Sequence, residues 1–421
     1  MRLAAHAIAV MIVFLGAAAC GDDDEDDPGN TPEAPAATTT PGDSATIEVG
    51  AILPLTGTLA SYGETSDAAL AEAVSAINSD SETQIELIIE DSASDPATAL
   101  EKLRALHERG IRVVIGPYSS SEVAAVMDFA NENGVIILSP LSTARTLAIA
   151  DDNVLRFTPD DEAEGAAVAS LAWADGVRTI VAVSRDDPGN NGLRTGMKAA
   201  FEAMGGTVLD GPTYATNETD FSDEVTAIET AVSSTGSLEQ TGVYLAAFSE
   251  VTGLFAAASQ SATLSGVPWY GSDSVALSRQ LVADATASNF AVETGYPNPI
   301  LGLRAEDEPL WGGLNDALSE DLGRSVDSFA FAAYDALVTA VAALSATAPS
   351  ADAMQLREAI IAAAAAADGL TGPLTLNDAG DRALAVYDFW AVCAGADEFV
   401  WVKAATAADG VAQRVNPPPT C

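Results

Sequence analysis

The sequence predicts an α/β fold built from two doubly wound parallel-sheet lobes that are joined by several crossings of the chain. Short apolar runs alternate with longer Ala-rich amphipathic runs from residue 46 to residue 143, which is the pattern of consecutive β-α-β units. The same alternation starts again at residue 179 and continues to residue 271. With 421 residues, the chain is long enough to bury the cores of two such lobes.

The expected elements follow one another in a regular order. In the first lobe we expect strands over 46–53, 84–91, 113–115 and 135–138, and helices over 65–78, 96–109 and 122–132. In the second lobe we expect strands over 179–184, 207–209, 242–246 and 269–271, and helices over 161–175, 193–204, 222–234 and 250–261. Crossing strands are expected over 155–160, 290–295 and 372–377, helices over 309–322, 325–346 and 352–367, and a closing hairpin over 384–392 and 399–402. Lobe 1 therefore takes residues 46–160 and 296–376, and lobe 2 takes residues 161–295 and 377–421.

Residues 113–143 (VVIGPYSSSEVAAVMDFANENGVIILSPLST) form the clearest strand–helix–strand unit. Ser120 or Ser121 is the expected N-cap of the helix, and Asn133-Gly134 ends it. Because such a unit makes its two strands parallel, both strands end at the same edge of the sheet.

Hydroxyl side chains follow both strands: Ser119, Ser120 and Ser121 come after the first, and Ser142 and Thr143 come after the second. Open α/β sheets bind ligands at this edge, and free N–H groups at a helix N-terminus suit a small anion such as a carboxylate. The sequence therefore indicates either an anion-binding edge or a set of capping and turn hydroxyls without a ligand.

Residues 1–19 have the features of a signal peptide, with a positive charge at Arg2 followed by an apolar run. The LGAAAC sequence that ends at Cys20 resembles the signal of bacterial lipoproteins, in which this cysteine receives lipid. We favour lipid on Cys20 over a transmembrane anchor, because the apolar run is short for a membrane span. The acidic and Pro/Thr/Ala-rich residues 20–45 are expected to form a disordered tether that holds the body at the extracytoplasmic face of the membrane.

Composition limits the classes of partner. The formal charge of −43 makes nucleic acid an unlikely partner, because its phosphate backbone would repel the protein.

With Cys20 assigned to lipid, Cys393 and Cys421 are left as a pair in an exported protein, which predicts a disulfide.

The sequence offers little catalytic chemistry. His107 is the one histidine after the signal, and it lies among charged residues of an expected helix. The chain has no nucleophile elbow, no phosphate-binding or dinucleotide-binding glycine motif and no zinc-ligand spacing. We therefore expect a protein that is not an enzyme, with no catalytic residues, no cofactor and no metal.

Several motifs occur together in a fixed order. They are GAILPLTGTLASYGE, EDSASDPATA, VVIGPYSSS, ILSPLSTA, LRFTPDD, WYGSD and GPLTLNDAGD. In this order and spacing they resemble the type I periplasmic-binding-protein fold, and more narrowly the Leu/Ile/Val-binding family of substrate-binding proteins of ABC transporters. The resemblance covers about residues 46–403.

The resemblance implies a set of ligand-binding residues in the first lobe. Tyr62 matches a tyrosine that lines the cleft, and its alternative is a turn aromatic that packs on the sheet. Ser120 matches the serine that holds the ligand carboxylate. Leu141 matches a position whose backbone carbonyl accepts from the ligand ammonium, and Thr143 matches the residue that binds both charged groups.

In the second lobe the resemblance assigns Asp273 to the ligand ammonium and Phe248 to the cleft wall. A buried ammonium needs a charged partner, which agrees with this role, and the alternative for Asp273 is an N-cap of a helix near residue 274. Phe329 belongs either to the side-chain pocket or to a helix core. One departure stands out: Gly189 and Asn190 occupy a turn where the family often has a tyrosine before a glycine, which opens the pocket to polar amino acids or amides.

We expect an extracytoplasmic receptor that captures an amino acid, of the branched-chain type or a related amino acid or amide, and delivers it to an ABC permease. One alternative is a sensor of the same fold that signals ligand state to a partner protein. The other is a lipoprotein hydrolase that uses Ser120.

Overall fold

The computed structural model describes residues 46–80 and 84–416. The signal sequence, the tether with Cys20, and Cys421 lie outside the described residues. Lipid on Cys20 and a disulfide between Cys393 and Cys421 therefore stay predictions.

The first sheet is parallel throughout, as the β-α-β pattern predicts, with the strand order β2-β1-β3-β4-β5. Its strands are β1 (Ile47–Leu53), β2 (Ile85–Asp91), β3 (Val113–Ile115), β4 (Ile136–Ser139) and β5 (Val154–Arg156). Parallel strands in this order place the carboxyl ends of β3 and β4 side by side, where the hydroxyl-bearing loops begin.

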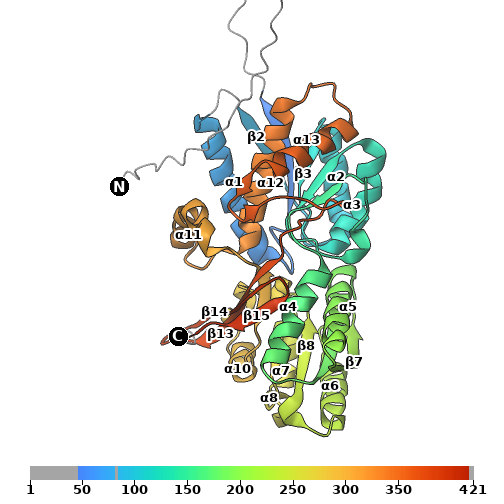
Figure 1. Ribbon diagram of the computed structural model, residues 1–421, viewed down its shortest axis with the longest axis vertical. Helices are drawn as coiled ribbons and strands as arrows, with labels where there is room; N and C mark the ends of the chain where they lie inside the picture. Colours follow the sequence, from blue (N-terminus) through green and yellow to red (C-terminus); the bar gives the residue numbers. More distant parts are fainter. Residues whose placement is uncertain (1–45, 81–83, 417–421) are drawn as a thin grey trace, which may run out of the picture. The chain divides into compact units, whose positions relative to one another are not determined.

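Helices cover both faces of this sheet (Figure 1). One face carries α1 (Ala60–Asp80), α12 (Ser328–Ala346) and α13 (Ala353–Ala365), and the other carries α2 (Pro96–Glu108) and α3 (Ser120–Asn133). Successive strand residues alternate between the two cores: Ile115 and Leu138 contact α12, whereas Ile137 packs toward α3.

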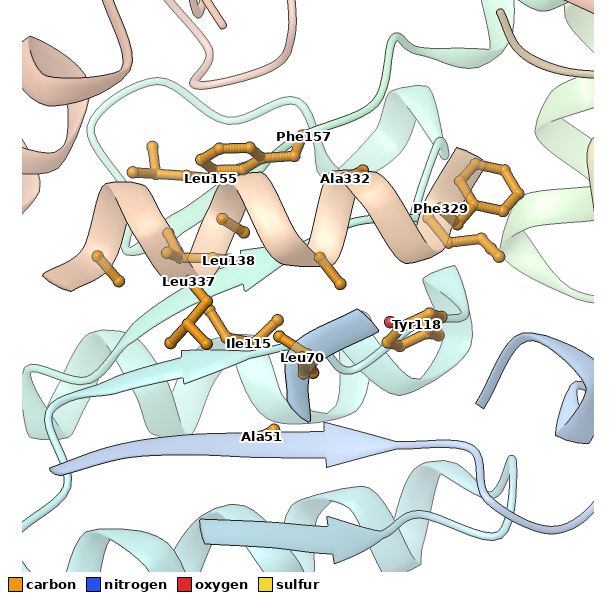
Figure 2. Packing of buried hydrophobic residues seen from close by; sticks show 14 of the residues in the cluster. Ala51, Leu70, Ile115, Tyr118, Leu138, Leu155, Phe157, Phe329, Ala332 and Leu337 are labelled. Atoms are coloured by element: carbon orange, nitrogen blue, oxygen red, sulfur yellow. The ribbon is translucent and has the colours of Figure 1, made fainter. Parts of the chain in front are cut away.

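Figure 2 shows the first of these cores, in which Leu337 of α12 lies over Leu138 and Ile115 of the sheet. A fully buried leucine contributes about 1.5–3 kcal/mol, so this contact stabilises the sheet edge that carries the loops. Among the described residues, α12 alone has the length and apolar composition of a membrane span, and most of it is buried as in a core helix.

The start of α3 differs from the sequence expectation, which placed the N-cap at Ser120 or Ser121. Ser119 is the N-cap, because the Glu122 carboxylate reaches back to accept from the Ser119 N–H at 2.8 Å while the Ser119 hydroxyl accepts from the Glu122 N–H at 3.2 Å. Such a capping box is worth about 1 kcal/mol. It makes Ser120 the first helical residue, so the Ser120 side chain does not serve as the cap.

A second parallel sheet has the strand order β7-β6-β8-β9. Its strands are β6 (Thr179–Arg185), β7 (Thr207–Tyr214), β8 (Thr241–Ala246) and β9 (Trp269–Tyr270). One face packs against α4 (Asp161–Ala174) and α5 (Pro188–Ala203), and the other packs against α6 (Ser222–Ser234), α7 (Val251–Ala258) and α10 (Ala285–Thr294). The expectation of two parallel α/β lobes is thus confirmed, and the lobe boundaries drawn from the sequence stay a prediction.

A third sheet is antiparallel, with the order β10-β13-β14-β15. Its strands are β10 (Asn298–Leu301), β13 (Val386–Ala394), β14 (Phe399–Ala408) and β15 (Val411–Arg414), so the predicted closing hairpin is present as β13 and β14. The remaining elements are α8 (Ala262–Ser265), α9 (Arg279–Ala283), α11 (Glu308–Leu322), β11 (Asp368–Gly369), β12 (Gly372–Pro373) and four short 3-10 turns.

The crossing strand expected over residues 290–295 is wrong, because these residues complete helix α10. Asp284 caps that helix by accepting from the Ala287 N–H at 2.9 Å, and Gly295 ends it in the left-handed conformation. Ala287, Phe290 and Ala291 are buried at helical spacing, and the crossing strand follows as β10.

Candidate functional site

A small cavity, with about 10 Å³ of interior space, lies where α3, the loop after β4, the start of α5 and the residues after β8 and β9 meet. This space is about what one water molecule needs, so a larger ligand would enter only if the surrounding elements moved apart. Its lining residues are Ser119, Ser120, Leu141, Thr143, Gly189, Asn190, Leu193, Phe248, Asp273 and Ser274. Five of the six residues predicted to bind ligand are therefore brought together here: Ser120, Leu141, Thr143, Phe248 and Asp273.

Tyr62, the sixth predicted residue, is not among the lining residues, but it contacts the backbone of the lining residue Asp273. Its hydroxyl donates to the backbone carbonyls of Asp273 at 3.0 Å and Ala276 at 2.6 Å, and its ring packs edge-on against Phe329 at 5.7 Å. Phe329 is buried at the start of α12 in the first core, as Figure 2 shows, which agrees with its helix-core alternative.

One wall of the cavity presents hydrogen-bond donors. The Ser120 Oγ accepts from the Ser142 hydroxyl at 3.1 Å and from the Ala144 N–H at 3.2 Å. Because this oxygen already accepts twice, its own proton is left to donate into the cavity. Ser120 also begins α3, where the helix dipole favours a negative charge. This wall suits a carboxylate.

A buried ion pair holds this wall in place. Arg156 and Asp381 form a two-pronged pair at 2.5 and 2.7 Å, and both side chains are about 1% exposed. The Arg156 guanidinium also donates to the backbone carbonyls of Ser142, at 3.3 Å, and Ala144, at 2.8 Å. These bonds fix the peptide groups on either side of Thr143, so the donor wall is pre-formed.

The opposite wall presents an acceptor. Asp273 lies three residues after the end of β9 and is buried. Its Oδ1 accepts a hydrogen bond from the Ser274 hydroxyl at 2.8 Å, whereas its Oδ2 has no hydrogen-bond partner within the described residues. Burial raises the pKa of Asp273 to about 7. Asp273 is the first residue of a short 3-10 turn that Ser272 precedes, so the N-cap alternative for Asp273 does not hold.

Two further buried carboxyls lie beside Asp273. The Glu164 Oε1 accepts from the Asp273 N–H at 3.2 Å, and burial together with the charge of Asp273 raises the pKa of Glu164 well above its usual value. Burial also raises the pKa of Asp161 to about 7, although a hydrogen bond from the Thr143 side chain opposes that rise. We call Asp161, Glu164 and Asp273 the acidic cluster. None of the three forms an ion pair with a basic side chain of the described residues, so a ligand that carries positive charge would complete it.

Phe248 closes one side of the cavity and is itself covered by Arg185. The guanidinium carbon of Arg185 lies 4.5 Å from the centre of the Phe248 ring, a cation–π contact, and the ring is 6% exposed. Arg185 therefore supports the aromatic wall through this contact.

The sequence analysis associated Gly189 and Asn190 with the pocket but placed them in a polar turn over residues 185–192, before a helix that begins at 193. In the structure α5 begins at Pro188, with Asp187 as its N-cap. The Asp187-Pro188 pair was the available signal, since an acidic N-cap followed by proline at the first helical position is typical of a helix start. A Cβ on Gly189 would stand 3.2 Å from the Ser120 Oγ, so glycine at this position lets α5 approach the donor wall.

Comparisons with known proteins agree with this geometry. Residues 46–395 match the family model described as periplasmic binding protein. The chain is 29% identical over 250 residues to an uncharacterized protein, MJ1266, of Methanocaldococcus jannaschii, an alignment that covers 57% of this chain and 60% of that one. It is 30% identical over 190 residues to a Leu/Ile/Val-binding protein of Rhizobium johnstonii, covering 44% of this chain and 52% of the relative. The chain thus matches little more than half the length of these relatives.

Solved structures share the fold. A leucine-binding protein of Thermotoga maritima superposes with a TM-score of 0.69 at 19% identity, covering 88% of this chain and 99% of that one. A solute-binding protein of an ABC transporter from R. palustris, in complex with benzoate, superposes with a TM-score of 0.70 at 21% identity, covering 88% and 98%. At these identities the likeness shows the fold alone.

Proposed function

Because the chain belongs to the periplasmic binding protein family, a family of non-enzymatic solute-binding proteins, we propose that it captures an amino acid in this cavity and delivers it to an ABC permease. In this proposal Ser120 and Thr143 hold the ligand carboxylate. The Leu141 carbonyl, the Thr143 hydroxyl and Asp273 hold the ammonium, and Tyr62 and Phe248 fix the acceptor wall and the aromatic wall.

One observation carries the proposal: Asp273 is a buried carboxyl whose Oδ2 has no hydrogen-bond partner among the described residues, and it lines the same cavity as Ser120, whose hydroxyl oxygen already accepts two hydrogen bonds. A donor wall and an acidic wall on one small cavity are complementary to a zwitterion, which has an acid group and an ammonium group on one carbon. Charged groups in such a water-poor site bind more strongly than in solvent.

The benzoate-bound relative raises the alternative of an aromatic acid, and the acidic cluster argues against it here. An aromatic acid would satisfy the donor wall but would leave Asp273 without a cation and would add a negative charge to a cavity already flanked by three carboxyls.

A thermal-denaturation screen distinguishes these ligands. We expect at least one of the twenty amino acids, at a hundredfold excess over its dissociation constant, to add about 3 kcal/mol of stability and raise Tm by about 5 °C or more. Benzoate and 4-hydroxybenzoate are the matched comparison and are expected to leave Tm unchanged. A shift with the benzoates alone, or with none of these compounds, would contradict the proposal.

We also propose that lipid on Cys20 anchors the protein outside the cytoplasmic membrane, with residues 20–45 as the tether. The family is one of periplasmic binding proteins, which agrees with an extracytoplasmic location. A tether of this length would let the body collect ligand and still reach a permease in the same membrane.

A further inference from the structure

The first turn of α5 brings Asn190, whose side-chain oxygen has no hydrogen-bond partner among the described residues, to the wall of the cavity. Asn190 is fully buried and lines the cavity together with Asp273. Its Oδ1 is inaccessible to solvent and, within the described part of the chain, accepts no hydrogen bond. A buried acceptor of this kind costs free energy unless a ligand supplies a donor.

The orientation of this amide is fixed by its neighbours. The Asn190 Nδ2 donates to the Asp187 Oδ2 at 2.7 Å, and the Asn190 backbone N–H donates to the Asp187 Oδ1 at 3.0 Å. Asp187 is in turn paired with the Arg185 guanidinium at 3.0 Å, and Arg185 lies on the Phe248 ring. Turning the amide over would set its oxygen against the Asp187 carboxylate, so the group left over for a ligand is an acceptor.

The ligand ammonium does not use this acceptor. An ammonium has three N–H donors, and the proposed function already gives it three acceptors: the Leu141 carbonyl, the Thr143 hydroxyl and the Asp273 Oδ2. The Asn190 Oδ1 is a fourth acceptor, and it needs a donor from elsewhere on the ligand.

We propose that Asn190 is a specificity-determining residue that selects amino acids whose short side chain carries an O–H or N–H donor. This inference rests on the proposed function and narrows its substrate class to hydroxyl and primary-amide amino acids. A ligand with an aliphatic side chain of the same size would leave the Asn190 oxygen buried without a partner. We expect such a ligand to bind about 10- to 100-fold more weakly.

Calorimetric titration with isosteric ligand pairs tests this inference. Threonine and valine have nearly the same shape, as do asparagine and leucine, and only the first of each pair has a side-chain donor. For the wild-type protein we expect threonine or asparagine to bind at least tenfold more tightly than its isostere. In Asn190→Leu, which removes the oxygen and keeps the side-chain volume, we expect that preference to disappear or reverse.

Asn191→Leu is the matched control, because Asn191 is the next residue of α5, is not among the lining residues and bonds instead to Ser184 and Asp186. It is expected to keep the wild-type preference. The wild-type comparison stands even if a variant fails to fold. Tighter binding of valine and leucine than of threonine and asparagine, or a preference that persists in Asn190→Leu, would overturn the inference while leaving the proposed function intact. Failure of every amino acid to bind would remove both.

Discussion

Asp273→Asn is expected to weaken the binding of the amino acid by at least a hundredfold. The substitution keeps the shape of the side chain and its hydrogen bond from Ser274, but it removes the negative charge opposite the ligand ammonium. Removing one partner of a buried charge pair costs about 3–5 kcal/mol, which corresponds to a loss of more than a hundredfold in affinity. Calorimetric titration with the tightest amino acid from the screen measures this change.

Asp223→Asn serves as the control, because it removes an exposed carboxyl from α6 in the same lobe and is expected to leave the affinity unchanged. The fold of the Asp273 variant can be checked independently. Above pH 7 its ligand-free form is expected to be more stable than the wild type, since it lacks a buried charge. An affinity within threefold of the wild type would exclude Asp273 from the site.

The second large effect concerns pH. Between pH 5 and pH 8, the ligand-free protein is expected to lose stability as the pH rises. The native carboxyls of Asp161 and Asp273 have pKa values of about 7, whereas an unfolded aspartate has a pKa of about 3.9. Between these values the native state holds more protons than the unfolded state, so deprotonation favours unfolding. Each such carboxyl accounts for about 3 kcal/mol over this interval.

Asp161→Asn isolates one of these contributions. Urea unfolding measures the free energy of unfolding at pH 5 and at pH 8. Between these two pH values, the variant should lose about 3 kcal/mol less of this free energy than the wild type loses. Asp128→Asn, which removes an exposed carboxyl of α3, should retain the wild-type loss. A wild-type protein that becomes more stable toward pH 8, or an Asp161 variant with the wild-type pH dependence, would show that the cluster is not protonated in the native state.

Much of the fold could be predicted from the sequence because its signals are local. β1 and β8 are β-branched apolar runs between turn residues, and α6 has the bounds that its spacing predicted. The errors also have local causes. Residues 290–295 contain the aromatic and β-branched residues of a strand, but the Asp284 cap and the burial of one helical face make them a helix.

The candidate site was predictable only where a motif marked it. Ser120, Thr143 and Asp273 follow buried strands; the order of the first sheet brings Ser120 and Thr143 together, and Asp273 lines the same cavity from the second sheet. Glu164 could not be found in this way, because it reaches Asp273 across 109 positions of the chain and is therefore placed by tertiary packing. Asn190 was associated with the pocket by the resemblance, but the orientation of its amide depends on the side chain of Asp187, which no motif marked.

The central claim is that one small molecule is held by its carboxylate at Ser120 and by its ammonium at Asp273. The most direct test is calorimetric titration of the wild-type protein with the tightest amino acid, with the amine that lacks its carboxylate, and with the acid that lacks its amine. We expect both analogues to bind at least a hundredfold more weakly than the amino acid, because each leaves one wall unpaired. An acid without the amine that binds as tightly as the amino acid would contradict the account.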